Sequence, residues 1–124
     1  MKKKITITDA IFNENKNELM LSTDEQISVG SLKPMEQMLV DSDNLSFIYI
    51  TDHLDDYTYI VIPEPFWSVL KKAMDQDSSV YLTNGNEDLQ LSGLHEELAY
   101  LIENIKGNSN YGEVMVEKVE GIFN

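Results

Sequence analysis

The sequence predicts a single α+β domain, in which an antiparallel sheet of about five to seven short strands is covered by about three to four helices. Two observations lead to this fold class. Strand-like segments follow one another across short turns, as in antiparallel hairpins, and three longer stretches between them carry apolar residues at helical spacing. A chain of 124 residues fits one domain over residues 1–124, and a hydrophobic fraction of 42% is sufficient for a core.

The N-terminal segment predicts a β-hairpin. Residues 4–12 alternate in polarity, with Ile5 and Ile7 on one face, and a polar stretch at 13–17 leads into a second strand at 19–21. The lysines that open the chain resemble the start of a signal peptide, but the alternation after them replaces the continuous apolar stretch that such a peptide needs. No apolar stretch approaches the roughly 20 residues that span a bilayer. We therefore expect a cytoplasmic protein with no membrane contact.

The middle of the chain predicts a short helix followed by two buried strands. Residues 26–29 supply a third short strand. Pro34 suits the first turn of a helix over 35–39, because its missing N–H would have no intrahelical partner there. Residues 45–51 and 57–62 carry aromatic and β-branched residues on both faces, which is typical of central strands.

The next segment predicts a helix and then a tight hairpin. Trp67 lies beside the apolar stripe of this helix and is interpreted as a core anchor. The stripe consists of Phe66, Val69, Leu70, Ala73 and Met74. The strands expected at 80–83 and 87–91 flank Asn84-Gly85, a dipeptide that favours a type I′ turn, in which both central residues need positive φ.

Two helices close the chain. The second runs from about 111 to 123, and the stripe of the first is Leu94, Leu98, Leu101, Ile102 and Ile105. Between them, Gly107 suits the left-handed residue that ends a helix, and Asn110 with Glu113 has capping-box spacing for the next. The last helix has more apolar residues than one stripe buries, so a homo-oligomer that pairs through this helix or a sheet edge is a further prediction. The residues concerned are Val114, Met115, Val116, Val119, Ile122 and Phe123.

Charge restricts the kinds of partner that the protein binds. Twenty-two acidic residues face nine lysines, the formal net charge is −13, and the chain has no arginine. Such a charge repels nucleic-acid backbones and anionic membranes, so we predict no direct nucleic-acid binding. A basic protein partner is the sharper interpretation of the charge, and solubility is the simpler one.

The sequence offers little catalytic chemistry. The absence of cysteine excludes thiol nucleophiles, iron–sulfur clusters and cysteine-type zinc sites, and no nucleophile elbow or phosphate loop is present. His53 lies in an acidic loop at 52–56, and His95 lies in the first turn of a helix at an expected surface position. Neither is supported by a second ligand cluster. We therefore predict no catalytic residue, no cofactor and no metal ligand, and favour a non-enzymatic protein.

Two polar loops form the candidate binding site. Residues 41–44 begin like a calcium loop but are not followed by the glycine and glutamate of an EF-hand, so a helix-to-strand connection with Asx turns is preferred. Residues 108–112 form either a plain turn or a polar pocket at a helix N-terminus. The candidate binding residues are Asp41, Asp43, Asn44, Asn108, Asn110, Tyr111 and Gly112.

Two runs of the sequence, residues 38–47 and 104–112, resemble the signatures of the YjbL-like family of short, acidic, functionally uncharacterised proteins of bacilli and their relatives. The resemblance extends over nearly the whole chain and is looser over the first thirty residues. It implies a cytoplasmic bacterial protein. It brings no assigned activity, cofactor or catalytic residue.

Two functions remain open. The first is a small, acidic, non-enzymatic interaction or regulatory protein that binds a basic macromolecular partner. The alternative is a domain that binds a small ligand or a divalent metal ion between the 41–44 and 108–112 loops. In that case Asp41 and Asp43 are ligands, and hydrogen bonds come from Asn108, Asn110 and Tyr111. The alternative requires the two loops to lie together.

Overall fold

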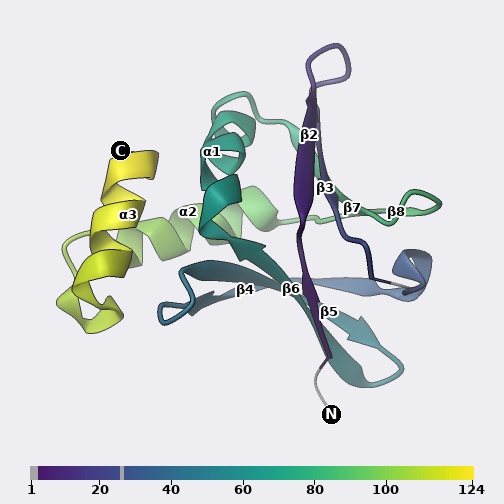
Figure 1. The fold of residues 1–124 in the computed structure, drawn as a ribbon, viewed down its shortest axis with the longest axis horizontal. Coiled ribbons are helices and arrows are strands. Elements are labelled where there is room, and N and C mark those ends of the chain that lie inside the picture. The colour runs from purple at the N-terminus through teal and green to yellow at the C-terminus, as the bar shows by residue number, and fades with distance from the viewer. Residues whose placement is uncertain (1–2, 26) are drawn as a thin grey trace.

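Eight strands in two four-stranded sheets and three α-helices make up the part of the chain that the structure describes, residues 3–25 and 27–124 (Figure 1). The structure is a computed structural model. Sheet A contains, in spatial order, β1 (Lys3–Thr6), β6 (Asp56–Pro63), β5 (Ser46–His53) and β4 (Lys33–Asp41). Sheet B contains β2 (Asp9–Asn13), β3 (Glu18–Ser22), β7 (Ser79–Thr83) and β8 (Asp88–Gln90). The helices are α1 (Trp67–Asp75), α2 (Leu94–Ile105) and α3 (Glu113–Phe123).

The α+β class is confirmed, but the prediction of one antiparallel sheet is wrong. There are eight strands, β1 pairs with β6 in parallel, and β3 pairs with β7 in parallel. The strand expected over 4–12 is divided: its first part joins sheet A, its second part joins sheet B, and the buried Ile7 lies between them. Short turns connect only neighbours in sequence, so they do not reveal parallel pairs between distant segments.

Residues 35–39 belong to strand β4 and not to the predicted helix. β4 is an edge strand of sheet A, and an edge strand tolerates Pro34 because its missing N–H breaks no interior ladder. The register shifts between Pro34 and Met38, and Glu36 takes φ 56° within this bulge. The strand expected at 26–29 is also wrong, since Val29 begins a single 3₁₀ turn and residues 27–28 are irregular. Gln26 lies outside the described residues.

The other elements follow the predictions with small shifts. The three α-helices are confirmed, and β5 is buried on both faces, whereas β6 alternates between buried and more exposed residues. The β7–β8 hairpin is confirmed, but its loop has four residues, 84–87, instead of two. Only Gly85 has positive φ in this loop, and the Asn84 Oδ1 accepts hydrogen bonds from the N–H groups of Asn86 and Glu87. None of the helices described is long and apolar enough to cross a membrane.

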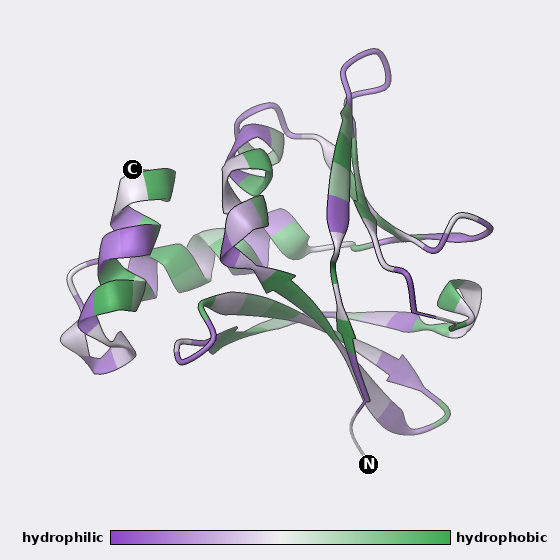
Figure 2. Ribbon diagram, in the orientation of Figure 1, coloured by the Kyte–Doolittle hydropathy of each residue, from purple (hydrophilic) through white to green (hydrophobic). Residues whose placement is uncertain are grey.

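The core lies between the inner face of sheet A, the helices and sheet B. In Figure 2, hydrophobic residues run along β6 and α2, where these layers meet. Its aromatic centre joins Phe47 of β5, Trp67 of α1 and Phe123 of α3, with ring centroids 4.8 Å apart for Phe47 and Trp67 and 6.2 Å apart for Trp67 and Phe123. The indole N–H of Trp67 donates to the carbonyl oxygen of Ile62 at 3.2 Å. The interpretation of Trp67 as a core anchor is confirmed.

The start of α2 is held tightly against sheet A. The hydroxyl of Tyr49 on β5 donates to the carbonyl oxygen of Ser92 at 2.6 Å. The next residue, Gly93, has φ 74°, and a Cβ at this position would lie 3.1 Å from the Cβ of Glu36 on β4. Both its conformation and its surroundings therefore favour glycine.

We expect Gly93→Ala to lower the free energy of unfolding by about 1–2 kcal/mol for the left-handed backbone alone, and by more because of the contact with Glu36. Urea denaturation followed by circular dichroism measures this. The matched control is Gly121→Ala in α3, where no atom lies within 4 Å of the added Cβ. That change should raise the free energy of unfolding by about 0.5–1 kcal/mol. Equal changes in the free energy of unfolding for the two substitutions would contradict the left-handed conformation and the close contact of Gly93.

Candidate functional site

The two loops that the sequence indicates lie together beside α3. The turn between β4 and β5 and the chain that enters α3 line a concavity of about 380 Å³, here called the loop concavity. In Figure 1 this turn lies next to the start of α3. The lining residues are Ser42, Asp43, Leu45, Tyr111, Gly112, Glu113, Val114 and Met115. The arrangement that the ligand-binding alternative requires is therefore present.

The 41–44 loop is a hairpin turn and not the predicted helix-to-strand connection. The Asp41 carboxylate accepts hydrogen bonds from the Asn44 backbone N–H at 3.3 Å and from its side-chain amide at 2.9 Å, which is the expected Asx bonding. Asp41 and Asn44 are therefore occupied within the turn, whereas Asp43 lines the loop concavity. Of the three, Asp43 alone is placed to contact a group bound in the loop concavity.

The 108–112 loop also uses its amides locally. The Asn108 Oδ1 accepts from the Asn110 N–H at 3.1 Å, and the Asn108 amide donates to the Asn104 carbonyl oxygen at 3.2 Å, so Asn108 caps the 3₁₀ turn Ser109–Tyr111. The predicted capping box of Asn110 with Glu113 is wrong, because Gly112 is the N-cap of α3 and no side chain caps it. From this loop, Tyr111 and Gly112 reach the loop concavity. Gly107 ends α2 at φ 68°, as predicted.

The loop concavity combines an apolar lining with a negative rim. Leu45 and Tyr111 are partly buried, Met115 is buried, and Val114 is 57% exposed. Asp43 and Glu113 are exposed, and neither carboxylate has a hydrogen-bond or ion-pair partner in residues 3–25 and 27–124. The N-terminus of α3 contributes only about half a positive charge. Two full negative charges outweigh it, so the loop concavity favours a cation over an anion.

The donor set does not suit a metal ion. In the described part of the chain, no group of three or more histidine, aspartate or glutamate side chains lies close enough to hold one. Calcium needs six to eight oxygen ligands and magnesium needs near-octahedral geometry, while the Asp41 carboxylate is already bonded to Asn44. The loop concavity therefore suits an organic cation better than a metal.

Both histidines make structural contacts. The Nε2 of His95 lies 2.6 Å from the carbonyl oxygen of Ser78, which ties the first turn of α2 to the start of β7. His95 is partly buried, so only part of its side chain lies at the surface. The Nδ1 of His53 lies 3.2 Å from the Ser31 hydroxyl.

Sequence reasoning did not assign most of the apolar lining to the loop concavity: it selected mainly polar residues for the site and named Val114 and Met115 only as surface for a homo-oligomer. Val114 carried a usable signal, because it falls outside the buried stripe of Met115, Val119 and Phe123 on α3. Leu45 carried none, because it looked like the first residue of a strand. The structure places it before β5, in the turn, at φ 46°.

Comparison with known proteins gives a consistent result over nearly the full chain. A family model described as a family of unknown function (UPF0738) matches residues 5–123. A UPF0738 protein of Bacillus velezensis is 46% identical over 123 residues, and the UPF0738 protein YjbL of Bacillus subtilis is 43% identical over 123 residues, with 99% of both chains covered in each case. A UPF0738 protein of Geobacillus kaustophilus is 38% identical over 117 residues, which cover 94% of each chain. No solved structure matches significantly. The resemblance inferred from residues 38–47 and 104–112 is thus confirmed, and the chain belongs to the UPF0738 family.

Proposed function

We propose that the protein is a small, acidic, non-enzymatic interaction or regulatory protein of the cytoplasm that binds a basic segment of a partner protein. The loop concavity receives a lysine or arginine side chain of that segment. The observation that carries the proposal is the pairing of an apolar lining with two unpaired carboxylates, Asp43 and Glu113, where the two loops meet.

Lysine and arginine match this lining because each has an apolar stem and a cationic end. The stem would lie along Leu45, Tyr111 and Val114, and the cationic end would reach Asp43 and Glu113 in a charge-assisted hydrogen bond. Exposed ion pairs contribute only about 0–1 kcal/mol each. The loop concavity is therefore an anchor point within a larger contact, and does not account for the whole affinity.

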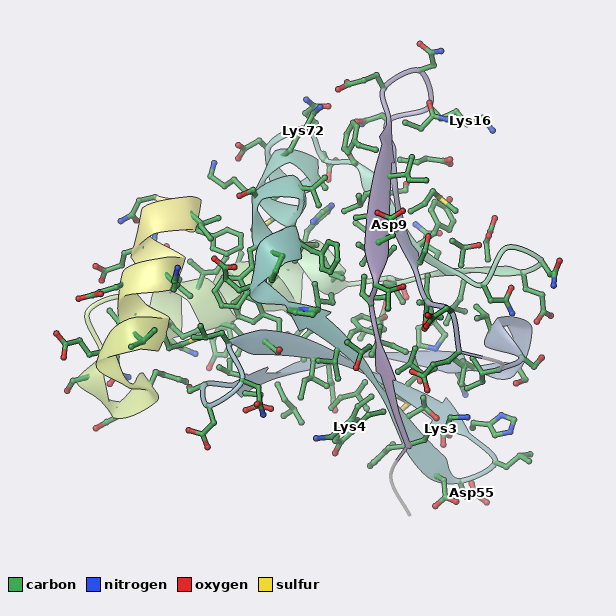
Figure 3. The ribbon with its side chains drawn as sticks, viewed as in Figure 1. Lys3, Lys4, Asp9, Lys16, Asp55 and Lys72 are labelled. Atoms are coloured by element: carbon green, nitrogen blue, oxygen red, sulfur yellow. The ribbon has the colours of Figure 1, made fainter. Side chains whose placement is uncertain are left out.

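The distribution of lysines leaves most acidic groups available to a partner. Four ion pairs join side chains of the described residues: Lys71 with Asp75, Lys72 with Glu14, Lys106 with Glu103, and Lys118 with Glu64. Figure 3 places the labelled Lys3, Lys4, Lys16 and Lys72 on β1, the β2–β3 loop and α1, away from α3. With a net charge of −13, long-range attraction should accelerate association with a basic partner. The same charge opposes direct contact with nucleic acid.

A small molecule with a cationic group is the second candidate. The loops meet, and about 380 Å³ falls within the range of roughly 300–1,000 Å³ that is typical of small-molecule sites. Asp41, Asn44, Asn108 and Asn110 would then shape the loops, while Asp43, Tyr111 and Gly112 would contact the ligand.

Site-specific photo-crosslinking in the organism that encodes the protein tests the proposal. A benzophenone side chain at Val114 should capture a protein with a lysine- or arginine-rich segment. The same group at Ile11, on β2 and similarly exposed (59% against 57%), should not capture it. If the loop concavity instead binds a small molecule, the benzophenone at Val114 should capture no protein. The mass of the purified native protein should then increase when it is mixed with the metabolite that it binds, as tested over a panel of metabolites.

Charge variants supply the matched control. Asp43→Asn with Glu113→Gln should reduce capture at least about fivefold, because the cationic end loses both partners. Asp9→Asn with Asp88→Asn changes the net charge equally on exposed strand residues and should reduce it much less. The proposal fails if the two double substitutions reduce capture equally, or if the captured protein has no lysine- or arginine-rich segment.

A further inference from the structure

The outer face of sheet A, which points away from the helices, has an apolar centre. From the same strands, Phe47, Tyr49 and Ile60 belong to the core cluster, while Ile48 and Ile50 are buried but lie outside it. In Figure 1 the three helices lie on the other side of this sheet. An apolar sheet face without a covering layer is a candidate interface.

Strand register arranges the outer face in rows. Leu39, Ile48, Val61 and Thr6 are neighbours across β4, β5, β6 and β1. The next row contains Ile50, Tyr59 and Lys4, and the row after that contains Lys33, Asp52 and Tyr57. Leu39 and Tyr57 are 42% and 47% exposed, so apolar surface remains accessible at both ends of the face.

Among residues 3–25 and 27–124, the charges on the outer face sum to zero, on a molecule of net charge −13. The charged side chains of this face in the paired registers are Lys4, Lys33, Asp41 and Asp52, two of each sign. Glu36, in the bulge of β4, lies against Gly93 at the start of α2 on the other side of the sheet. A basic partner therefore gains little here, whereas a second copy meets no local repulsion.

Lys4 and Asp41 lie at diagonal corners of the outer face, on its two edge strands. Three strand spacings and four residues along the strands separate them, about 14 Å in each direction. A second copy can be placed on this face by a two-fold axis that lies in the plane of the face and runs diagonally between the two corners. This rotation brings Lys4 of each copy over Asp41 of the other. The strands of the two copies then cross at about 90°, which is one of the two arrangements that packed sheets adopt.

We propose that the protein forms a two-fold homodimer through the outer face of sheet A, with Lys4 of each copy paired to Asp41 of the other. The face is about 19 Å wide for four strands and about 26 Å long for the eight residues of each central strand, β5 and β6. Because the strands of the two copies cross at about 90°, the faces overlap over about 19 Å by 19 Å and bury roughly 700 Å² in total, so a weak, transient dimer with dissociation in the upper micromolar range is expected. α3 is the poorer surface, because its Met115, Val119 and Phe123 are buried in the core of the same chain.

Sedimentation velocity of the full chain, from about 1 to 200 μM, tests the proposal. The native protein should dimerise, and Leu39→Glu should weaken the dimer at least about tenfold by placing a charge in the apolar row. Ile11→Glu adds the same charge to exposed β2 and should act much less. Circular dichroism checks that both variants remain folded. A monomer at every concentration, or equal effects of the two variants, would overturn the proposal.

A charge exchange tests the two-fold pairing. Lys4→Glu should weaken the dimer, and Asp41→Lys added to the same chain should restore it, because each copy again presents one cation to one anion. Because Asp41→Lys also removes the hydrogen bonds of the Asp41 carboxylate to Asn44, Asp41→Asn is measured as well: it keeps an oxygen that accepts from the Asn44 N–H and should weaken the dimer as Lys4→Glu does. A dimer that Asp41→Asn leaves unchanged overturns this pairing. The dependence on salt concentration distinguishes the dimer from the proposed function. Added salt screens the repulsion between two chains of charge −13 and should strengthen the dimer. The same salt should weaken the binding of a basic partner.

Discussion

Replacing Trp67 with alanine is expected to lower the free energy of unfolding by about 3–5 kcal/mol, a large part of the roughly 5–15 kcal/mol that stabilises a domain. Its side chain has no exposed surface and contacts both Phe47 and Phe123. The substitution leaves a cavity where β5, α1 and α3 meet and removes the hydrogen bond to the Ile62 carbonyl oxygen. Trp67 is the only tryptophan in the sequence, so urea denaturation should be followed by circular dichroism rather than fluorescence.

Two control substitutions show whether the loss of stability comes from packing in the core or from any change to an aromatic residue. Trp67→Phe keeps an aromatic ring but loses the indole N–H and part of the volume, and should cost about 2 kcal/mol. Tyr100→Ala, at an aromatic residue that is 64% exposed, should change stability by no more than about 0.5 kcal/mol. Similar costs for all three substitutions would show that Trp67 is not the centre of the core.

Removing the hydroxyl of Tyr49 should lower the free energy of unfolding by about 1–3 kcal/mol at neutral pH. The hydroxyl donates to the Ser92 carbonyl oxygen at 2.6 Å from a fully buried side chain. Tyr49→Phe keeps the ring and leaves that carbonyl without its donor at the start of α2. Urea denaturation measures the loss, and Tyr100→Phe is the exposed control.

The same variant should show a distinctive dependence on alkaline pH. Burial raises the pKa of the Tyr49 phenol above its ordinary value of 10.0, and the nearby Glu36 charge acts in the same direction. The folded protein holds the proton to higher pH than the unfolded chain does, so the stability that Tyr49 contributes is complete below about pH 10 and declines above it. The difference in stability between the native protein and Tyr49→Phe should therefore narrow above pH 10. A constant or widening difference would contradict the burial of the phenol.

Local signals in the sequence were sufficient for the three α-helices and for the β2–β3 and β7–β8 hairpins. The stripe Leu94, Leu98, Ile102 and Ile105 is buried along α2, and Gly107 ends that helix in a left-handed conformation. β2 pairs with β3 across a short polar turn, as expected. These features depend on residues within one or two turns of each other, which is the range over which periodicity is informative.

The division into two sheets depends on distant contacts. Residues 35–39 have a short mixed pattern that suits a helix or a strand equally, and pairing with β5 decides it. Pro34 was read as a helix start because the position of β4 at a sheet edge is a tertiary property. The parallel partners of β1 and β3 likewise lie outside the reach of local pattern.

The candidate site likewise depends partly on local sequence and partly on contacts between residues that are distant in the sequence. Both loops were identified from their polar residues, but Asp41 and Asn108 use their side chains to shape their own turns. The loop concavity exists because the end of sheet A brings Leu45 close to Val114, two residues about seventy positions apart. Sequence located the loops, and tertiary structure determined which of their atoms face a partner.

The parallel pairing of β1 with β6 affects how the chain folds during its synthesis. Thr6 pairs with Val61, and at roughly 5–20 residues per second the ribosome needs about 3–11 s to add the intervening 55 residues. Throughout that interval Ile5 and Ile7, both fully buried at the end, have no strand of sheet A to join. The apolar nascent segment therefore remains exposed until about half of the protein has been made, which makes it a natural ligand for chaperones at the ribosome exit.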